Sequence, residues 1–290
     1  MANVKDLTGI TDEELILRIR EGSYAALDRL IRRHQSFIYN VALRYALNPQ
    51  EAQDLSQEAM LKIVTDIGSF AGRSTFRTWA YRIVVNTFLN SKRGLMEKQI
   101  TTFADYGEAL DSLPLTDFPA KTAPPDAALL VQEAKLSCML GMLLCLDREQ
   151  RLIYILGDIF ALPAETASVL FDLQPPAFRK RLQRARADLR NFMDQKCGLV
   201  NKTNPCRCRR KTQAFIRAGW VNASNLKFTR PTLKRVGEHA KRATPELDAA
   251  LETEYSTLYR QHPYYDGPEL ATKFRALLQD DRLRDMFGLG

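Results

Sequence analysis

The segment from Gly72 to Arg93 reads GRSTFRTWAYRIVVNTFLNSKR and decides the fold of the N-terminal part of the chain. Ser74 is a suitable N-cap, because its hydroxyl can accept a backbone N–H of a first helical turn. At about 100° per residue, the following helix gathers an apolar face that we expect to point toward a core. This face consists of Phe76, Ala80, Ile83, Val84 and Thr87.

An adjoining arc of the same helix combines an aromatic ring with amides and guanidinium groups. Its members are Trp79, Arg82, Asn86, Asn90 and Arg93. Aromatic rings stack on unpaired bases, amides pair with base edges, and guanidinium groups bind phosphate. The pattern alone leaves two interpretations open, a surface for single-stranded nucleic acid or an amphipathic helix with a solvated basic flank.

The segment resembles the promoter-melting helix of bacterial extracytoplasmic-function (ECF) sigma factors, whose pattern runs roughly F-x-G-x-S-x-F-R-T-W-L-Y-R-I-A-x-N. The matching residues are Phe70, Gly72, Ser74, Phe76, Arg77, Thr78, Trp79, Tyr81, Arg82, Ile83 and Asn86. The resemblance implies contacts with the −10 promoter element by Arg77, Trp79, Arg82, Asn86, Asn90 and Arg93. It extends from about Asp12 to Phe192.

A second helix start is signalled by Asn48 as N-cap and Pro49 at the first helical position. The helix that follows carries an exposed cluster of polar residues around one leucine: Asp54, Gln57, Glu58 and Leu61. Such a cluster is either plain solvated surface or a docking face for a basic helix. DLSQEAMLK resembles the D-L-x-Q-E-x-F-L-K segment by which sigma factors bind the clamp helices of core RNA polymerase, with Met60 in place of the usual aromatic. The resemblance implies that the four residues of the cluster contact polymerase.

A helix-turn-helix is predicted from Pro163 to about Phe192, with Asp172, Leu173 and Gln174 as its turn. The run PPAFRKRLQRARADLR resembles the sigma pattern G-T-V-K-S-R-L-H-R-A-R-x-x-L-R. The resemblance implies that the second helix reads duplex DNA at the −35 element, through Arg179, Lys180, Arg181, Arg184 and Arg186. Two features depart from the pattern, since Asp172 occupies the usual turn glycine and Pro175 with Pro176 stiffens the helix entry.

Charge is distributed unevenly along the 290 residues. The net charge is +8, but 19 Lys and Arg face 3 Asp and Glu between Phe178 and Arg242, which gives +16 there and −8 elsewhere. This basic segment is typical of polyanion binding. With no apolar run of about 20 residues and no apolar signal region, we expect a cytoplasmic protein that does not bind membranes. We find no catalytic constellation, so neither an enzyme nor a small-molecule substrate is expected.

The predicted fold is all-α, with two small helical domains, a linker and a small helical C-terminal extension. The first helices are expected at Asp12–Glu21 and at Ser23 to about Leu47. Between Thr101 and Asp126, four prolines and five acids against Lys121 predict an acidic linker. It is either a solvated tether or, by the resemblance, a segment that threads the polymerase cleft. The predicted boundaries are 12–93 for the core- and −10-binding domain, 94–128 for the linker, 129–195 for the helix-turn-helix domain and 196–290 for the extension.

The extension brings Cys197, Cys206 and Cys208 within twelve positions. They could hold zinc or copper, or act in redox chemistry, or have only a local structural use. A fourth metal ligand would have to come from His239 or His262. The basic run that includes Arg207 and Arg209 predicts lowered thiol pKa values. Two helices are predicted further on, at Pro245–Arg260 and Glu269–Phe287.

Together these features predict a sigma factor that recruits core RNA polymerase to promoters and helps open the −10 element. Its expected partners are core RNA polymerase and promoter DNA, and an anti-sigma factor is a further candidate. Two alternatives remain: a stand-alone helix-turn-helix regulator with a metal- or redox-sensing C-terminal segment, and a metal- or thiol-responsive sensor. In the first alternative, Asp54, Gln57 and Glu58 would be dispensable.

Overall fold

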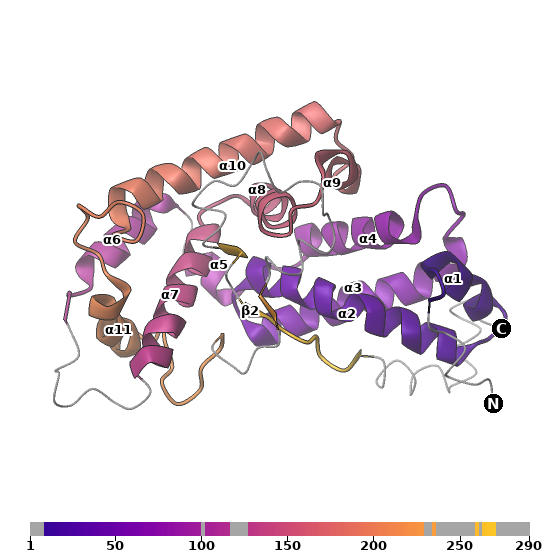
Figure 1. Ribbon diagram of the computed structural model, residues 1–290, viewed down its shortest axis with the longest axis horizontal. Coiled ribbons are helices and arrows are strands. Elements are labelled where there is room, and N and C mark those ends of the chain that lie inside the picture. The colour runs from indigo at the N-terminus through magenta and orange to yellow at the C-terminus, as the bar shows by residue number, and fades with distance from the viewer. Residues whose placement is uncertain are drawn as a thin grey trace.

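The computed structural model describes residues 9–99, 102–116, 127–228, 234–235, 259–260 and 263–270. Its first four helices are gathered at one end of the molecule (Figure 1). They are α1 (Asp12–Arg20), α2 (Tyr24–Ala46), α3 (Pro49–Asp66) and α4 (Phe76–Asn90), with a 3₁₀ turn at Ile67–Ser69 between the last two. The helices predicted for this part of the sequence are thereby confirmed, except that the last of them ends at Asn90 and does not reach Arg93.

The remaining helices continue from this end across the molecule. Two are short, α5 (Leu95–Gln99) and α6 (Phe103–Ser112), and the next is α7 (Ala127–Leu143). Helix α8 (Arg148–Tyr154) runs into a π-helical turn at Ile155–Ile159, followed by α9 (Ala164–Leu170), α10 (Pro175–Lys196) and α11 (Cys208–Arg217). The fold is helical as predicted, apart from a two-residue antiparallel ladder between β1 (Lys234–Arg235) and β2 (Pro263–Tyr264).

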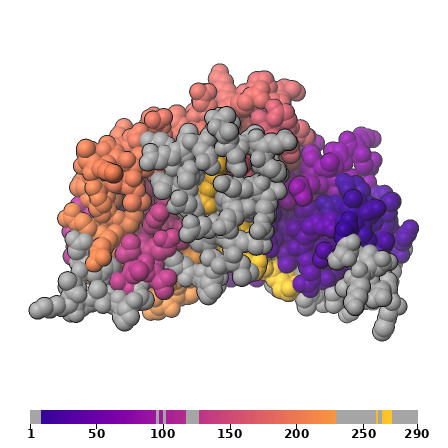
Figure 2. Space-filling model, viewed as in Figure 1, coloured from indigo at the N-terminus to yellow at the C-terminus, as the bar shows by residue number. Residues whose placement is uncertain are grey.

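The space-filling view shows how these parts are distributed (Figure 2). The N-terminal helices, in indigo and purple, lie at one end, and the segment of the extension up to residue 228, in orange, lies at the other. Helix α10, in salmon, forms the upper edge between them. None of the described helices is long and apolar enough to span a membrane.

Side-chain caps set the starts of the N-terminal helices. Asn48 caps α3 as predicted, because its Oδ1 accepts the backbone N–H groups of Gln50 and Glu51 at 2.8 and 3.2 Å. The prediction of Ser74 as the cap of α4 is wrong. Thr75 Oγ1 accepts the N–H of Thr78 at 3.2 Å, so the helix begins one residue later than predicted.

Part of the predicted linker is helical, which corrects the expectation of irregular chain there. The apolar residues of α6, Phe103, Tyr106 and Leu110, recur at helical spacing, and the four prolines all follow this helix. The Tyr106 hydroxyl donates to the carbonyl of Cys138 on α7 at 2.9 Å. The domain boundaries themselves remain predictions, and residues 117–126 lie outside the described part of the chain.

The two predicted domains pack directly against each other in this arrangement. The Phe37 ring of α2 stacks on Tyr81 of α4, with centroids 4.7 Å apart, and its edge meets Phe160 beyond α8 at 4.9 Å. The buried Arg44 guanidinium lies over the same Phe160 ring. One apolar cluster therefore runs from α1 through α10.

The first part of the extension packs on α7 and α6. Phe215 and Trp220 have ring centroids 4.9 Å apart, and Trp220 stacks on Tyr106 of α6 at 5.7 Å. The two helices predicted beyond Pro245 fall mostly outside the described residues. Of that region only residues 259–260 and 263–270 are described.

Candidate nucleic-acid interface

Helix α4 buries a wider surface than its predicted core face. Phe76, Ala80, Val84 and Thr87 are buried as expected, and Ile83 is half-buried. Tyr81, Val85 and Phe88 are buried as well. Helix α2 covers two of these rings, since Tyr81 stacks on Phe37 and Phe88 stacks on Tyr45.

The polar arc of α4 remains largely open to solvent. Asn86, Asn90 and Arg93 are exposed. Trp79 is half-buried, and its ring rests on Phe70 and Phe76 with centroids 5.5 and 5.6 Å away. Arg77 is exposed too, but it lies two residues, about 200°, from Trp79 and so belongs to another side of the helix. The structure thus gathers four of the six predicted −10 residues on one arc of α4, whereas Arg93 lies beyond the end of the helix at Asn90 and Arg77 lies on another side.

Arg82 differs from its neighbours on this arc, because the helix-turn-helix already occupies it. Its Nε and Nη2 donate to the carbonyl oxygen of Val169 on α9 at 3.2 and 3.0 Å. Its Nη2 also pairs with the carboxylate of Asp172 in the turn. In this arrangement the guanidinium is therefore engaged by protein rather than free for phosphate.

The predicted polymerase-binding residues lie together on one face of α3. Asp54, Glu58 and Leu61 are exposed and Gln57 is half-buried. Glu58 pairs with Lys62 at 2.8 Å in an exposed i,i+4 ion pair, which contributes little to stability. The apolar side chain of Leu61 is thus exposed on the same face as the acids Asp54 and Glu58, while the opposite face of the helix is buried.

The outer face of α10 carries four exposed basic residues, Arg179, Lys180, Arg181 and Arg184. Arg179 pairs with Glu165 of α9 at 3.0 Å, and Arg181 pairs with Glu149 of α8. Arg186 has a different position, because it is half-buried and donates to both carboxylate oxygens of the buried Asp158 at 3.2 and 3.0 Å. Its guanidinium holds α10 to the preceding turn instead of facing outward with the others.

The turn before α10 keeps a left-handed conformation although it lacks glycine. Asp172 has φ of 53°, a region where Asp is tolerated better than most residues. The N–H of Leu173 donates to the carbonyl of Ser168 at 3.0 Å and closes the turn. Pro175 is the first residue of α10, where its missing N–H leaves no bond unmade. The two departures from the sigma pattern are therefore compatible with a helix-turn-helix.

Comparison with known proteins shows which family these surfaces are similar to. Residues 30–96, which hold the polar faces of both α3 and α4, match the family described as Sigma-70 region 2. This part of the chain is therefore similar to a region of sigma factors, and residues 30–96 are called region 2 below. It is 40% identical over 84 residues to the RNA polymerase sigma-H factor of Pseudomonas aeruginosa, and 37% identical over 81 residues to the ECF RNA polymerase sigma-E factor of Haemophilus influenzae.

Coverage differs among these relatives. The match covers 29% of this chain and 44% of the P. aeruginosa protein, and 28% of this chain and 42% of the H. influenzae protein. The chain thus spans less than half the length of these two curated relatives. The ECF RNA polymerase sigma-E factor of Escherichia coli K12 is 26% identical over 182 residues, which are 63% of this chain and 94% of that protein.

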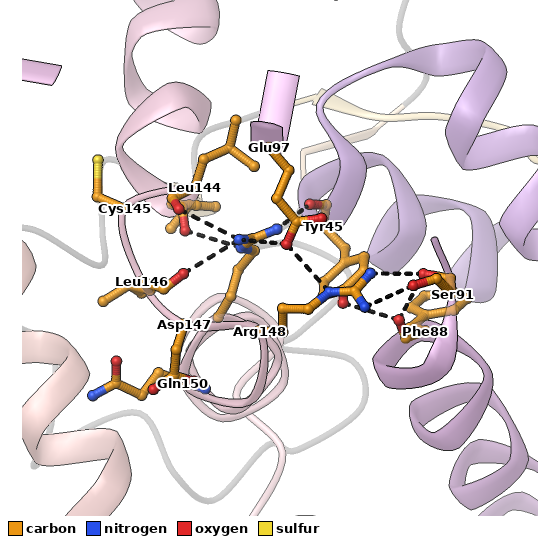
Figure 3. Close-up of polar contacts among 12 residues, drawn as sticks. Tyr45, Phe88, Ser91, Glu97, Leu144, Cys145, Leu146, Asp147, Arg148 and Gln150 are labelled. Atoms are coloured by element: carbon orange, nitrogen blue, oxygen red, sulfur yellow. Dashed lines mark hydrogen bonds and ion pairs between the residues drawn. The ribbon is translucent and has the colours of Figure 1, made fainter. Parts of the chain in front are cut away.

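A cluster of Arg148, Arg151 and Glu97 next to region 2, which we call the cationic hub, was not predicted from the sequence (Figure 3). Arg148 and Arg151 of α8 each lie 3.2 Å from the same Glu97 oxygen of α5. Arg148 also donates to the carbonyls of Leu89 and Ser91 at the end of α4, at 2.7 Å each. The hub therefore ties the end of region 2 to the helix-turn-helix domain. Both arginines belong to the segment LDREQRLIYIL, which resembles the sigma pattern L-P-x-x-Q-R-x-V-F-x-L. This pattern does not indicate which residues the arginines contact.

The cysteines of the extension behave differently from the prediction. Burial raises the pKa of the Cys206 thiol and raises that of Cys208 to about 12, with the neighbouring thiols adding to both shifts. The expected lowering is wrong because burial outweighs the effect of Lys211 and Arg207, which still act to lower the pKa of Cys206. Among the described residues, no three His, Cys, Asp or Glu side chains are placed to hold a metal ion. His239 and His262 lie outside these residues, so a zinc or copper site stays an untested prediction.

Proposed function

We propose that the chain binds core RNA polymerase, directs it to specific promoters and helps melt the −10 element. The observation that carries this function is the separation of two exposed surfaces on region 2. The acidic face of α3 and the polar arc of α4 lie on different helices, and both are supported by the buried core of the same domain. One protein surface can therefore hold polymerase while another engages DNA.

In this function the face of α3 docks against a basic helical partner on polymerase. Asp54 and Glu58 supply the charge, and Leu61, 37% exposed, supplies apolar contact at its centre. At a protein interface, most of the binding free energy comes from a few well-packed anchor residues whose neighbours exclude water. This assignment also accounts for a leucine that the fold leaves in solvent.

DNA is engaged by the two other surfaces. The half-buried Trp79 offers a ring edge and face beside the amides of Asn86 and Asn90, which suits unpaired bases of the −10 element. The N-terminal half of α10 presents Arg179, Lys180, Arg181 and Arg184 to a major groove at the −35 element. Phosphate neutralisation by these side chains makes binding strongly salt-dependent.

A stand-alone helix-turn-helix regulator is the second candidate. It is favoured by the exposed basic face of α10, which needs no polymerase to bind duplex DNA. The two functions differ in whether the acidic face of α3 is required. In both, the cytoplasmic location follows from the need to reach chromosomal DNA, and the protein is not an enzyme.

Charge reversal tests the proposal directly. Asp54→Lys combined with Glu58→Lys is expected to abolish binding to core polymerase and promoter-specific transcription in vitro, with an unchanged helical circular-dichroism spectrum. The matched control is Glu21→Lys with Asp66→Lys, which makes the same charge change at exposed positions away from the Asp54–Leu61 face. Wild-type transcription by the Asp54/Glu58 variant would reject the polymerase-binding role and favour the stand-alone regulator.

A further inference from the structure

The described residues near the C-terminus, 259–260 and 263–270, form what we name the C-terminal strap. One end of the strap is bonded to the helix-turn-helix domain. The Tyr259 hydroxyl donates to the carbonyl of Met139 on α7 at 3.0 Å, and Arg260 Nε donates to the carbonyl of Asp158 at 2.8 Å. Tyr259 is fully buried there, and its ring meets Tyr154 of α8 with centroids 5.5 Å apart.

The other end of the strap is bonded to α2 of region 2. The buried Asn40 amide makes two bonds with the backbone of Tyr265. Its Oδ1 accepts the N–H at 3.0 Å, and its Nδ2 donates to the carbonyl at 2.6 Å. The N–H of Gly267 donates to Ser36 Oγ at 3.1 Å, and the N–H of Leu270 donates to Gln35 Oε1 at 3.2 Å. Polar side chains of α2 thus satisfy the strap backbone much as a neighbouring strand would.

Close packing fixes the strap on α2. A Cβ atom added at Gly267 would lie 2.9 Å from both the carbonyl carbon and oxygen of Gln35 and 3.0 Å from the Cα of Ser36. These are backbone atoms of a long buried helix, which cannot move aside as a flexible side chain would. Leu270 is fully buried at the end of this contact, and an exposed ion pair joins Glu269 to Arg32 at 2.9 Å.

Within about a dozen residues of chain, the strap therefore forms hydrogen bonds with both DNA-binding domains. In the same arrangement, Arg82 of α4 is held by the Val169 carbonyl and the Asp172 carboxylate of the helix-turn-helix. That contact is exposed, and an exposed ion pair is worth only about 0–1 kcal/mol. The Arg82 contact therefore depends on other interactions that hold the two domains together. The strap supplies several such interactions, and they are buried.

We infer that the C-terminal strap is an intramolecular ligand of α2 that restrains single-stranded DNA binding by α4. While it is seated, the helix-turn-helix lies over Arg82, and a phosphate must displace Asp172 to reach the guanidinium. Release of the strap from α2 removes one set of buried links between the two domains and weakens the contact that holds Arg82, which lies on the same arc as Trp79 and Asn86. The inference rests on the proposed function of α4, and it adds a built-in control of that surface.

Gly267→Ala is the variant that tests this inference, because it displaces the strap without altering either DNA-binding surface. Gly68→Ala is the matched control, since nothing lies within 4 Å of a Cβ at that position. Hydrogen–deuterium exchange of the full chain measures seating. Peptides covering 263–270 and 164–172 should exchange faster in Gly267→Ala and at the wild-type rate in Gly68→Ala. Unchanged exchange of the 263–270 peptide in Gly267→Ala would overturn the seating on α2.

The second measurement is binding of a fluorescein-labelled single-stranded dT12. We expect Gly267→Ala to bind it at least fivefold more tightly than the wild type, and Gly68→Ala to match the wild type. Equal affinity in a variant whose strap exchanges faster would overturn the control of α4. Binding of core polymerase by the wild type tests the proposed function separately, because it depends on α3 and not on the strap.

Discussion

Arg151 and Tyr45 are joined twice across the boundary between region 2 and the helix-turn-helix domain. The guanidinium of Arg151 lies 5.1 Å from the centre of the Tyr45 ring, and its Nη1 donates to the Tyr45 carbonyl at 3.1 Å. Arg151 is almost fully buried, and its Nε donates to the Leu143 carbonyl at 3.0 Å. One side chain therefore bonds the end of α2 and the end of α7 together.

Arg151→Met should lower the free energy of unfolding by about 3–5 kcal/mol, because it removes one of the two cations paired with Glu97 and takes a donor from several buried carbonyls. Urea unfolding followed by circular dichroism at pH 7 measures the change. The control is Arg190→Met, whose guanidinium is exposed and lies 3.7 Å from Asp194. It should cost less than about 1 kcal/mol. Equal effects of the two substitutions would contradict a structural role for the hub.

Local signals explain how much of this fold could be predicted. The caps at Asn48 and Ser23 and the apolar spacing of α4 act within a few residues, so the helix positions and the faces of α3 and α4 followed from the sequence. Glu97 and Arg151 lie 54 residues apart, and Asn40 and Tyr265 lie 225 apart. Such pairs depend on how the helices pack, which no local pattern encodes.

The cysteine prediction failed for a related physical reason. It considered the cations that are close in sequence and left out the burial of the thiols. Arg207 and Lys211 still act to lower the pKa of Cys206, but the structure buries Cys206 and Cys208 beside α7. Burial disfavours the charged thiolate more than the remaining cations favour it.

Trp79→Ala combined with Asn86→Ala should leave polymerase binding intact and impair promoter opening. Stacking is worth about 1–3 kcal/mol per base, so open-complex formation should fall by about 5- to 150-fold on a duplex promoter. A premelted −10 template should restore part of the activity, and Trp79→Phe should retain more activity than Trp79→Ala because it keeps a ring. Lys92→Ala, at an exposed position just beyond α4, is the control. An equal defect on duplex and premelted templates would show that α4 has no role in melting.

Cys206 and Cys208 should react slowly with iodoacetamide at pH 7 in the folded protein. The thiolate is the reactive form, and burial raises the pKa of Cys208 to about 12, so its alkylation rate should keep rising through pH 9–11. Because this folded pKa exceeds the unfolded value of about 8.5, the thiol contributes stability that is fully present below pH 8.5 and is lost as pH rises toward 12. Mass spectrometry of alkylated peptides, with Cys208→Ser as the reference for assignment, measures the rate. Half-maximal alkylation of Cys208 below pH 8 would mean that the thiol is not buried as described. It would support the lowered pKa that was predicted from the neighbouring cations.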